Sequence, residues 1–157
     1  FDAGIRSTFI DPFPDLLGRL VRTADQPDIV ESRLQDVPLE RFTELEANDI
    51  LFIDSTHVVR VGSDVNYLFF SVLPALQPGV FIHLHDIFYP FEYPLQWLRE
   101  GRQWSELYLL RAFLMYNAAF EVVLMNAYLF HNHRELMLEQ FPLCCSEQFG
   151  SIWLRKM

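Results

Sequence analysis

Apolar residues along this chain fall into two patterns: short unbroken runs, and longer stretches in which apolar positions recur with a helical period. The clearest run is residues 50–53, four apolar positions that end at Asp54, and it predicts a buried strand. The clearest helical pattern follows Ser63, where apolar side chains recur at spacings of three and one as far as Leu76. Ser63 suits an N-cap, and Pro78 marks the end of this predicted helix.

The same two patterns predict elements along the rest of the chain. Strands are expected at residues 7–10, 28–31, 49–54, 80–84, 120–130 and 151–155. Helices are expected at residues 14–21, 39–45, 63–76, 105–116 and 134–140. Strands that alternate with helices indicate an α/β fold, in which right-handed helical crossovers join parallel strands. Because ligands of such sheets bind beyond the carboxyl ends of the strands, those ends are where chemistry is expected.

The composition fits one domain over residues 1–157, with 51% apolar and 15% aromatic residues, which argues against disorder. No apolar run reaches the roughly 18–20 residues that a membrane span needs. The formal charge of −9 argues against a nucleic-acid partner. The only two cysteines, Cys144 and Cys145, are adjacent, so a cytoplasmic, reducing setting is expected. The chain starts at Phe1 without a starting Met, and we expect it to begin inside a longer protein.

Aspartates stand at the ends of the predicted strands. They are Asp11, Asp36, Asp54 and Asp86. Any one of them could cap a turn, because an Asp side chain readily accepts backbone hydrogen bonds there. Four on one rim of a sheet would repel one another unless a ligand or metal used them.

Asp54 and Asp86 form the sharpest pair among these aspartates. If their strands are neighbours, the two backbones lie about 4.8 Å apart and both carboxylates project past the same edge. With His57 and His85 nearby, they could hold a divalent cation such as Mg²⁺ or Mn²⁺. The alternative is that both aspartates cap turns. His57 could serve as a general base or be an ordinary polar loop residue, whereas His83 is expected to be a satisfied core histidine that points into helix packing.

Several segments, taken in order, resemble the "methyltransferase domain 24" type of class I methyltransferases. The resemblance covers nearly the whole chain. It is carried by Asp54-Ser55-Thr56-His57, Gly62-Ser63-Asp64-Val65, residues 78–88, residues 8–14, residues 35–39, Tyr108-Leu109-Leu110 and residues 151–155. It implies a Rossmann-like three-layer sandwich with a seven-stranded sheet. Residues 7–11 would be the second strand, and the first strand and helix, with their glycine-rich loop, would precede Phe1.

The resemblance also implies a role for each candidate residue toward S-adenosylmethionine and a metal. Asp11 would bind the cofactor ribose, and Asp36 or the backbone beside it would contact the adenine. Asp54 would bind the cofactor and would also be a metal ligand. Asp86 would be a second metal ligand, and His57 would be catalytic. His85 would be a third metal ligand, at a position where related enzymes carry Glu.

These observations are consistent with three functions. The first is O-methylation of a sugar or other small polar molecule, assisted by Mg²⁺ or Mn²⁺, with residues 88–104 covering the substrate or forming a face between copies of the chain. The second is a non-catalytic methyltransferase-like module for interaction or oligomerisation, which the absence of any G-x-G pattern favours. The third is a metal-dependent hydroxylase-like protein. The expected partner is a small-molecule substrate, and no nucleic acid or membrane is expected to bind. The sequence does not decide whether the chain forms homo-oligomers.

Overall fold

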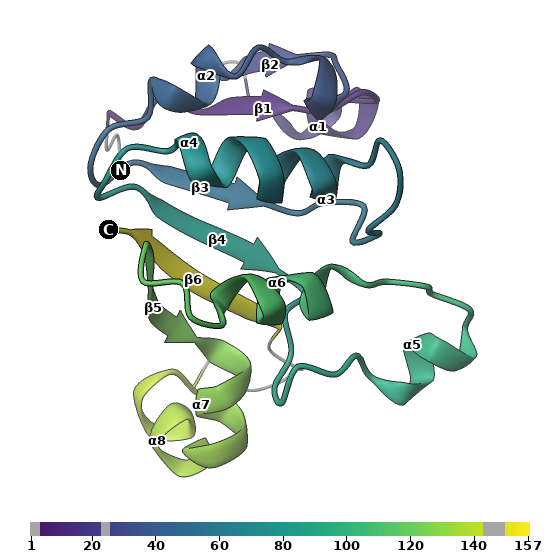
Figure 1. Cartoon of the computed structure of the whole chain (residues 1–157), viewed down its shortest axis with the longest axis vertical. Coiled ribbons are helices and arrows are strands. Elements are labelled where there is room, and N and C mark those ends of the chain that lie inside the picture. Colours follow the sequence, from purple (N-terminus) through teal and green to yellow (C-terminus); the bar gives the residue numbers. More distant parts are fainter. Residues whose placement is uncertain (1–3, 23–25, 143–149) are drawn as a thin grey trace. The chain divides into compact units, whose positions relative to one another are not determined.

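The computed structural model describes residues 4–22, 26–142 and 150–157, which form a mixed α/β protein (Figure 1). The chain divides into two compact units, Phe1–Pro38 and Leu39–Met157. The mixture of helices and strands confirms the predicted α/β class and is compatible with a Rossmann-like sheet. None of the helices in the described residues is both long and apolar enough to cross a membrane.

The first unit is a small βαβ arrangement. Strands β1 (Thr8–Ile10) and β2 (Asp28–Val30) pair in parallel, with Phe9 opposite Ile29. Helix α1 (Asp15–Leu20) lies between them in sequence and carries an acidic first turn and a basic last turn, which suit the helix dipole. The 3₁₀ turn η1 (Leu34–Asp36) follows β2. Asp36 therefore lies in a turn beyond β2 and not at a strand end, which corrects the prediction for this residue.

The second unit is built on a four-stranded sheet in the order β3-β4-β6-β5 (Figure 1). Strands β3 (Ile50–Ile53) and β4 (Phe81–His85) are parallel, whereas β6 (Ser151–Lys156) runs antiparallel to both β4 and β5 (Phe120–Met125). The parallel pair brings the carboxyl ends of β3 and β4 to one edge, as the sequence predicted.

Helices cover the sheet face that carries the core. A continuous helical stretch runs through α3 (Asp64–Tyr67), the π-helical turn η2 (Leu68–Val72) and α4 (Leu73–Ala75). Ser63 caps it by accepting a hydrogen bond from the Asn66 N–H, and the wide π turn lies just before Pro74, which has no N–H to donate to a regular helix. Phe69 meets Phe113 of α6 (Glu106–Leu114) edge to face at 5.4 Å. The fully buried residues that pack here include Ile82, Leu84, Leu107, Leu110 and Leu154.

The remaining helices are short. They are α2 (Glu40–Thr43), α5 (Leu95–Arg99), α7 (Asn126–Asn132) and α8 (Arg134–Gln140). Residues 134–140 form the predicted helix, whereas the strand predicted at 120–130 ends at Met125 and continues as α7. Met125 pairs with Ile152, and the described part of β6 begins one residue earlier, at Ser151. In α7 the backbone groups of residues 126–132 are satisfied within the helix. Cys144 and Cys145 lie outside the described residues.

Candidate functional site

Three predicted site residues meet at the carboxyl edge of the second unit's sheet. Asp54 directly follows β3 and Asp86 directly follows β4, and Ile53 and Leu84 are paired between the two strands. His57 lies on the loop that leaves β3. One ligand atom from each of Asp54, His57 and Asp86 lies within 4.8 Å of the other two. The Nε2 atom of His57 is 3.3 Å from Asp54 Oδ1 and 3.8 Å from Asp86 Oδ2.

The backbone at this site is turned into the left-handed region at two positions. His57 has φ 58° and Asp86 has φ 55°. Non-glycine residues rarely adopt this conformation, and it is maintained only where surrounding contacts hold it, most often at functional sites. Two of the three residues whose side chains converge, His57 and Asp86, thus also have left-handed backbones, a conformation that Gln26, Asn48, Phe91 and Tyr116 adopt elsewhere.

His57 is buried, with 5% of its side chain exposed, and its other ring nitrogen is bonded to Glu106. The Nδ1 atom lies 2.8 Å from Glu106 Oε2, and this same oxygen accepts a hydrogen bond of 2.9 Å from Ser55 Oγ. Ser55 Oγ in turn accepts from the His57 backbone N–H at 2.9 Å. The ring of Trp104 covers the imidazole at a centroid distance of 4.1 Å. His57 is therefore fixed from three sides.

The electrostatics of the site follow from burial and the crowding of charges. Burial alone would lower the pKa of His57, but its hydrogen bond to Glu106 and the charges of Glu106, Asp86 and Asp54 together raise it. Burial raises the pKa of Asp86, against the opposing influence of His85 and His57. Three carboxylates therefore surround one imidazole, an arrangement that favours a positive charge among them.

The two histidines of β4, His83 and His85, lie beside this cluster. His85 has 46% of its side chain exposed, with Nε2 3.8 Å from Asp86 Oδ1, but it is outside the three-residue group. Its role as a third metal ligand stays a prediction. His83 is buried as predicted, but its neighbours are Phe52 and Trp153 on the adjacent strands, not helices. Its Nδ1 has no hydrogen-bond partner among the described residues, so it is not the satisfied core histidine that was expected.

The first unit holds the other two predicted cofactor residues. Asp11 follows β1, and its Oδ1 accepts a hydrogen bond of 2.8 Å from the Phe13 N–H, which fixes the carboxylate in a turn. Asp36 is held by Arg33, whose Nε and Nη2 donate to its two carboxylate oxygens at 2.8 and 3.0 Å. Asp11 thus presents a fixed carboxylate past its strand, whereas both oxygens of Asp36 are already engaged.

Comparison with known protein families gives one finding that bears on this geometry. A family model described as "Methyltransferase domain" matches residues 2–87, more than half of the chain. The chain belongs to this methyltransferase-domain family. No curated protein and no solved structure matches it. Asp11, Asp36, Asp54, His57 and Asp86 all lie within the matched residues.

The structure adds residues to the cluster around His57 that sequence reasoning missed. Glu106 and Trp104 lie beyond the family match, and Ser55 lies within it. Glu106 stands in the first turn of α6, where an acidic residue is explained by the helix dipole alone. No sequence signal tied it to His57, 49 positions earlier.

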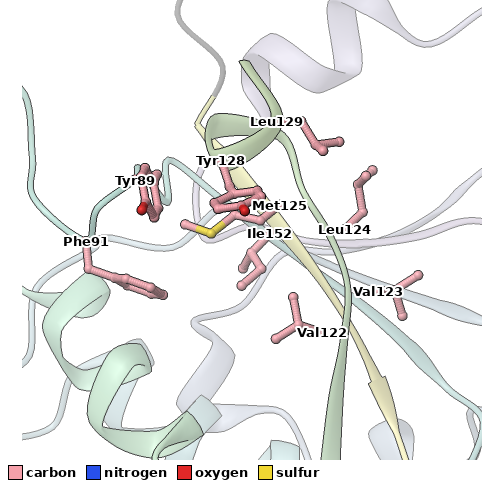
Figure 2. A pocket seen from close by; sticks show the side chains of 9 residues that line it. All are labelled: Tyr89, Phe91, Val122, Val123, Leu124, Met125, Tyr128, Leu129 and Ile152. Carbon is pink, nitrogen blue, oxygen red and sulfur yellow. The ribbon is translucent and has the colours of Figure 1, made fainter. Parts of the chain in front are cut away.

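An apolar pocket of about 440 Å³ lies in the same unit, beside the ends of β5 and β6 (Figure 2). Figure 2 shows Tyr89 and Phe91, from the segment after β4, facing Met125 and Tyr128 across it. Ile152 also lines it and pairs with Leu84, two residues before Asp86. The predicted substrate-covering segment therefore contributes both to this pocket and, through Trp104, to the surroundings of His57.

Proposed function

We propose that this chain acts in S-adenosylmethionine-dependent O-methylation of a small polar molecule, such as a sugar, with a divalent cation assisting. The observation that carries the proposal is the convergence of Asp54, His57 and Asp86 at the carboxyl edge of the sheet. Membership of a methyltransferase-domain family supports the reaction class.

The donor set fits a divalent cation. The carboxylate oxygens of Asp54 and Asp86 lie close enough to contact one ion beside His57, and Asp54 is 58% exposed, which leaves room for the water ligands that Mg²⁺ and Mn²⁺ retain. His57 Nε2 faces two carboxylate oxygens, and either a proton or a cation between them would relieve the repulsion of three lone-pair donors. A cation bound by Asp54 and Asp86 would act as a Lewis acid on the acceptor hydroxyl.

The chain's own residues would supply the proton acceptor. His57 Nε2 takes the proton of the acceptor hydroxyl as that oxygen bonds to the methyl carbon. When bound, S-adenosylmethionine would supply this methyl from its positively charged sulfur, and the electron pair of the broken carbon–sulfur bond would stay on that sulfur as a neutral thioether. Trp104 covers the imidazole and excludes water from one side of it.

For the cofactor, Asp11 offers a fixed carboxylate just past β1, which suits ribose hydroxyls. Because Arg33 engages both oxygens of Asp36, we assign the adenine contact to the backbone beside Asp36 rather than to its carboxylate. An oxygen-rich ligand set also favours this function over the hydroxylase-like alternative, whose iron sites use two histidines and one carboxylate.

The experiment is calorimetric titration of the metal-stripped chain with Mn²⁺ and, separately, with S-adenosylmethionine. We expect Mn²⁺ to bind and its affinity to fall at least tenfold in Asp54→Asn and in Asp86→Asn, because each loses a charged ligand. Asp15→Asn, a matched change at the start of α1, should leave Mn²⁺ affinity unchanged. Mn²⁺ binding that is equal in all four proteins would rule out the metal site. Absence of S-adenosylmethionine binding, tested in the longest natural form of the protein, would rule out the methyltransferase function and favour the non-catalytic module.

A further inference from the structure

The carboxylate of Glu106 lies fully buried behind His57. None of its side chain is exposed, and its Oε2 accepts a hydrogen bond from Ser55 Oγ and lies 2.8 Å from His57 Nδ1. Its Oε1 has no hydrogen-bond partner among the described residues. A buried carboxyl group of this kind costs free energy, so its retention calls for a reason beyond packing.

The hydrogen bonds around Glu106 determine where the imidazole proton lies. Ser55 Oγ accepts from the His57 N–H, so its own hydrogen is directed to Glu106 Oε2. A carboxylate oxygen can only accept, so the nitrogen that faces it, His57 Nδ1, must carry a hydrogen. When the ring is neutral, Nε2 is then left with a free lone pair, and Nε2 is the atom that faces Asp54 and Asp86.

We propose that Glu106 is the positioning residue of this site, which fixes the tautomer and the orientation of His57. Ser55 completes the arrangement by orienting the carboxylate. The assignment rests on the proposed function, in which His57 Nε2 takes the acceptor proton. A buried carboxylate that holds a catalytic imidazole in one tautomer is an established way to prepare a base.

The backbone allows this role to be separated from a merely structural one. The Ser105 N–H and the Glu106 N–H donate to the His57 carbonyl oxygen at 2.7 and 3.1 Å. These bonds do not involve the Glu106 side chain, and they keep the His57 loop attached to the start of α6. A change of the side chain alone should therefore alter the ring and leave the loop in place.

The test is NMR of ¹⁵N-histidine-labelled, metal-free chain at pH 9, which identifies the protonated nitrogen of each neutral ring. We expect His57 to carry its proton on Nδ1 in the wild type and in Glu106→Gln, which retains an acceptor oxygen. In Glu106→Leu the proton should move to Nε2, where Asp54 Oδ1 lies 3.3 Å away to accept it. Glu92→Leu removes an exposed glutamate that bonds Tyr108, and it should leave the His57 tautomer unchanged.

An Nε2 proton on His57 in the wild type would overturn the proposal, as would an unchanged tautomer in Glu106→Leu. The wild-type spectrum decides the question even if Glu106→Leu does not fold. In a methyl-transfer assay Glu106→Leu should lower kcat on the order of 10²-fold with little change in the acceptor KM, because a base is lost and not a binding contact. The spectra need neither metal nor cofactor, so failure of the proposed function and failure of this inference give different results.

Discussion

The stability of the second unit should depend on pH through His83. Burial and, to a lesser extent, the neighbouring His85 lower the pKa of His83 to about 4, against a smaller opposing influence of Asp54. The side chain is 7% exposed and stacks on Phe52 at a centroid distance of 4.3 Å. In the unfolded chain the pKa returns to about 6.5. Between these values the unfolded state binds a proton that the folded state does not, so stability is lost as the pH falls from 6.5 towards 4.

The shift from 6.5 to about 4 corresponds to about 3 kcal/mol, at 1.36 kcal/mol for each pKa unit. His83→Phe keeps an aromatic ring between Phe52 and Trp153 and removes the titrating group. We expect the free energy of unfolding of the wild type, relative to this variant, to fall by about 3 kcal/mol between pH 8 and pH 4. Urea unfolding followed by tryptophan fluorescence measures it, because all three tryptophans lie in the second unit.

His133→Phe, at an exposed position, is the matched control, and its stability difference from the wild type should change little over the same pH range. A constant difference between wild type and His83→Phe across pH 4–8 would refute this explanation. It would mean that the pKa of His83 is the same in the folded protein as in the unfolded chain.

Two further changes test the packing of the second unit. Gly79→Ala places a Cβ 2.6 Å from Ala47 Cβ at a residue with φ +92°, so we expect the free energy of unfolding in urea to fall by about 2–4 kcal/mol. Gly62→Ala, at φ +70° with no atom within 4 Å of the added Cβ, measures the backbone cost alone, and its free energy of unfolding should fall by less. Leu84→Ala removes a fully buried side chain from β4 and should lower the free energy of unfolding by about 2–5 kcal/mol. Leu95→Ala, at a residue that is 59% exposed, should change it by less than about 0.5 kcal/mol. Equal losses in the two variants would contradict the placement of the core.

Periodicity predicted the elements that position the site because each has a strong local signal. The run before Asp54 is unbroken, and the helix after Ser63 has both an N-cap and an apolar stripe. The prediction failed after Met125, where residues 126–130 continue an apolar run that fits a strand or a helix equally well. The choice between them depends on where β6 begins, and that pairing is set by residues far along the chain.

The convergence of Asp54, His57 and Asp86 could also be predicted, because parallel strands bring their carboxyl ends together. Asp36 was placed wrongly because β2 ends at Val30 and the chain passes through the 3₁₀ turn η1 before it reaches this residue. The bond between Asp36 and Arg33, three residues earlier, has the spacing of an ordinary turn, and it engages the carboxylate that sequence reasoning reserved for the cofactor.

Glu106 shows why a site inferred from one part of a chain is incomplete. The family match ends at residue 87, and within it His57 has only acceptors, Asp54 and Asp86, beside its Nε2. Those contacts alone would favour a proton on Nε2, which would leave the ring unable to act as a base at that atom. The carboxylate of Glu106 reverses this preference from the opposite side of the ring, across 49 positions of sequence. The catalytic assignment of His57 therefore depends on a residue outside the matched segment, and substitution of Glu106 is the sharpest way to examine it.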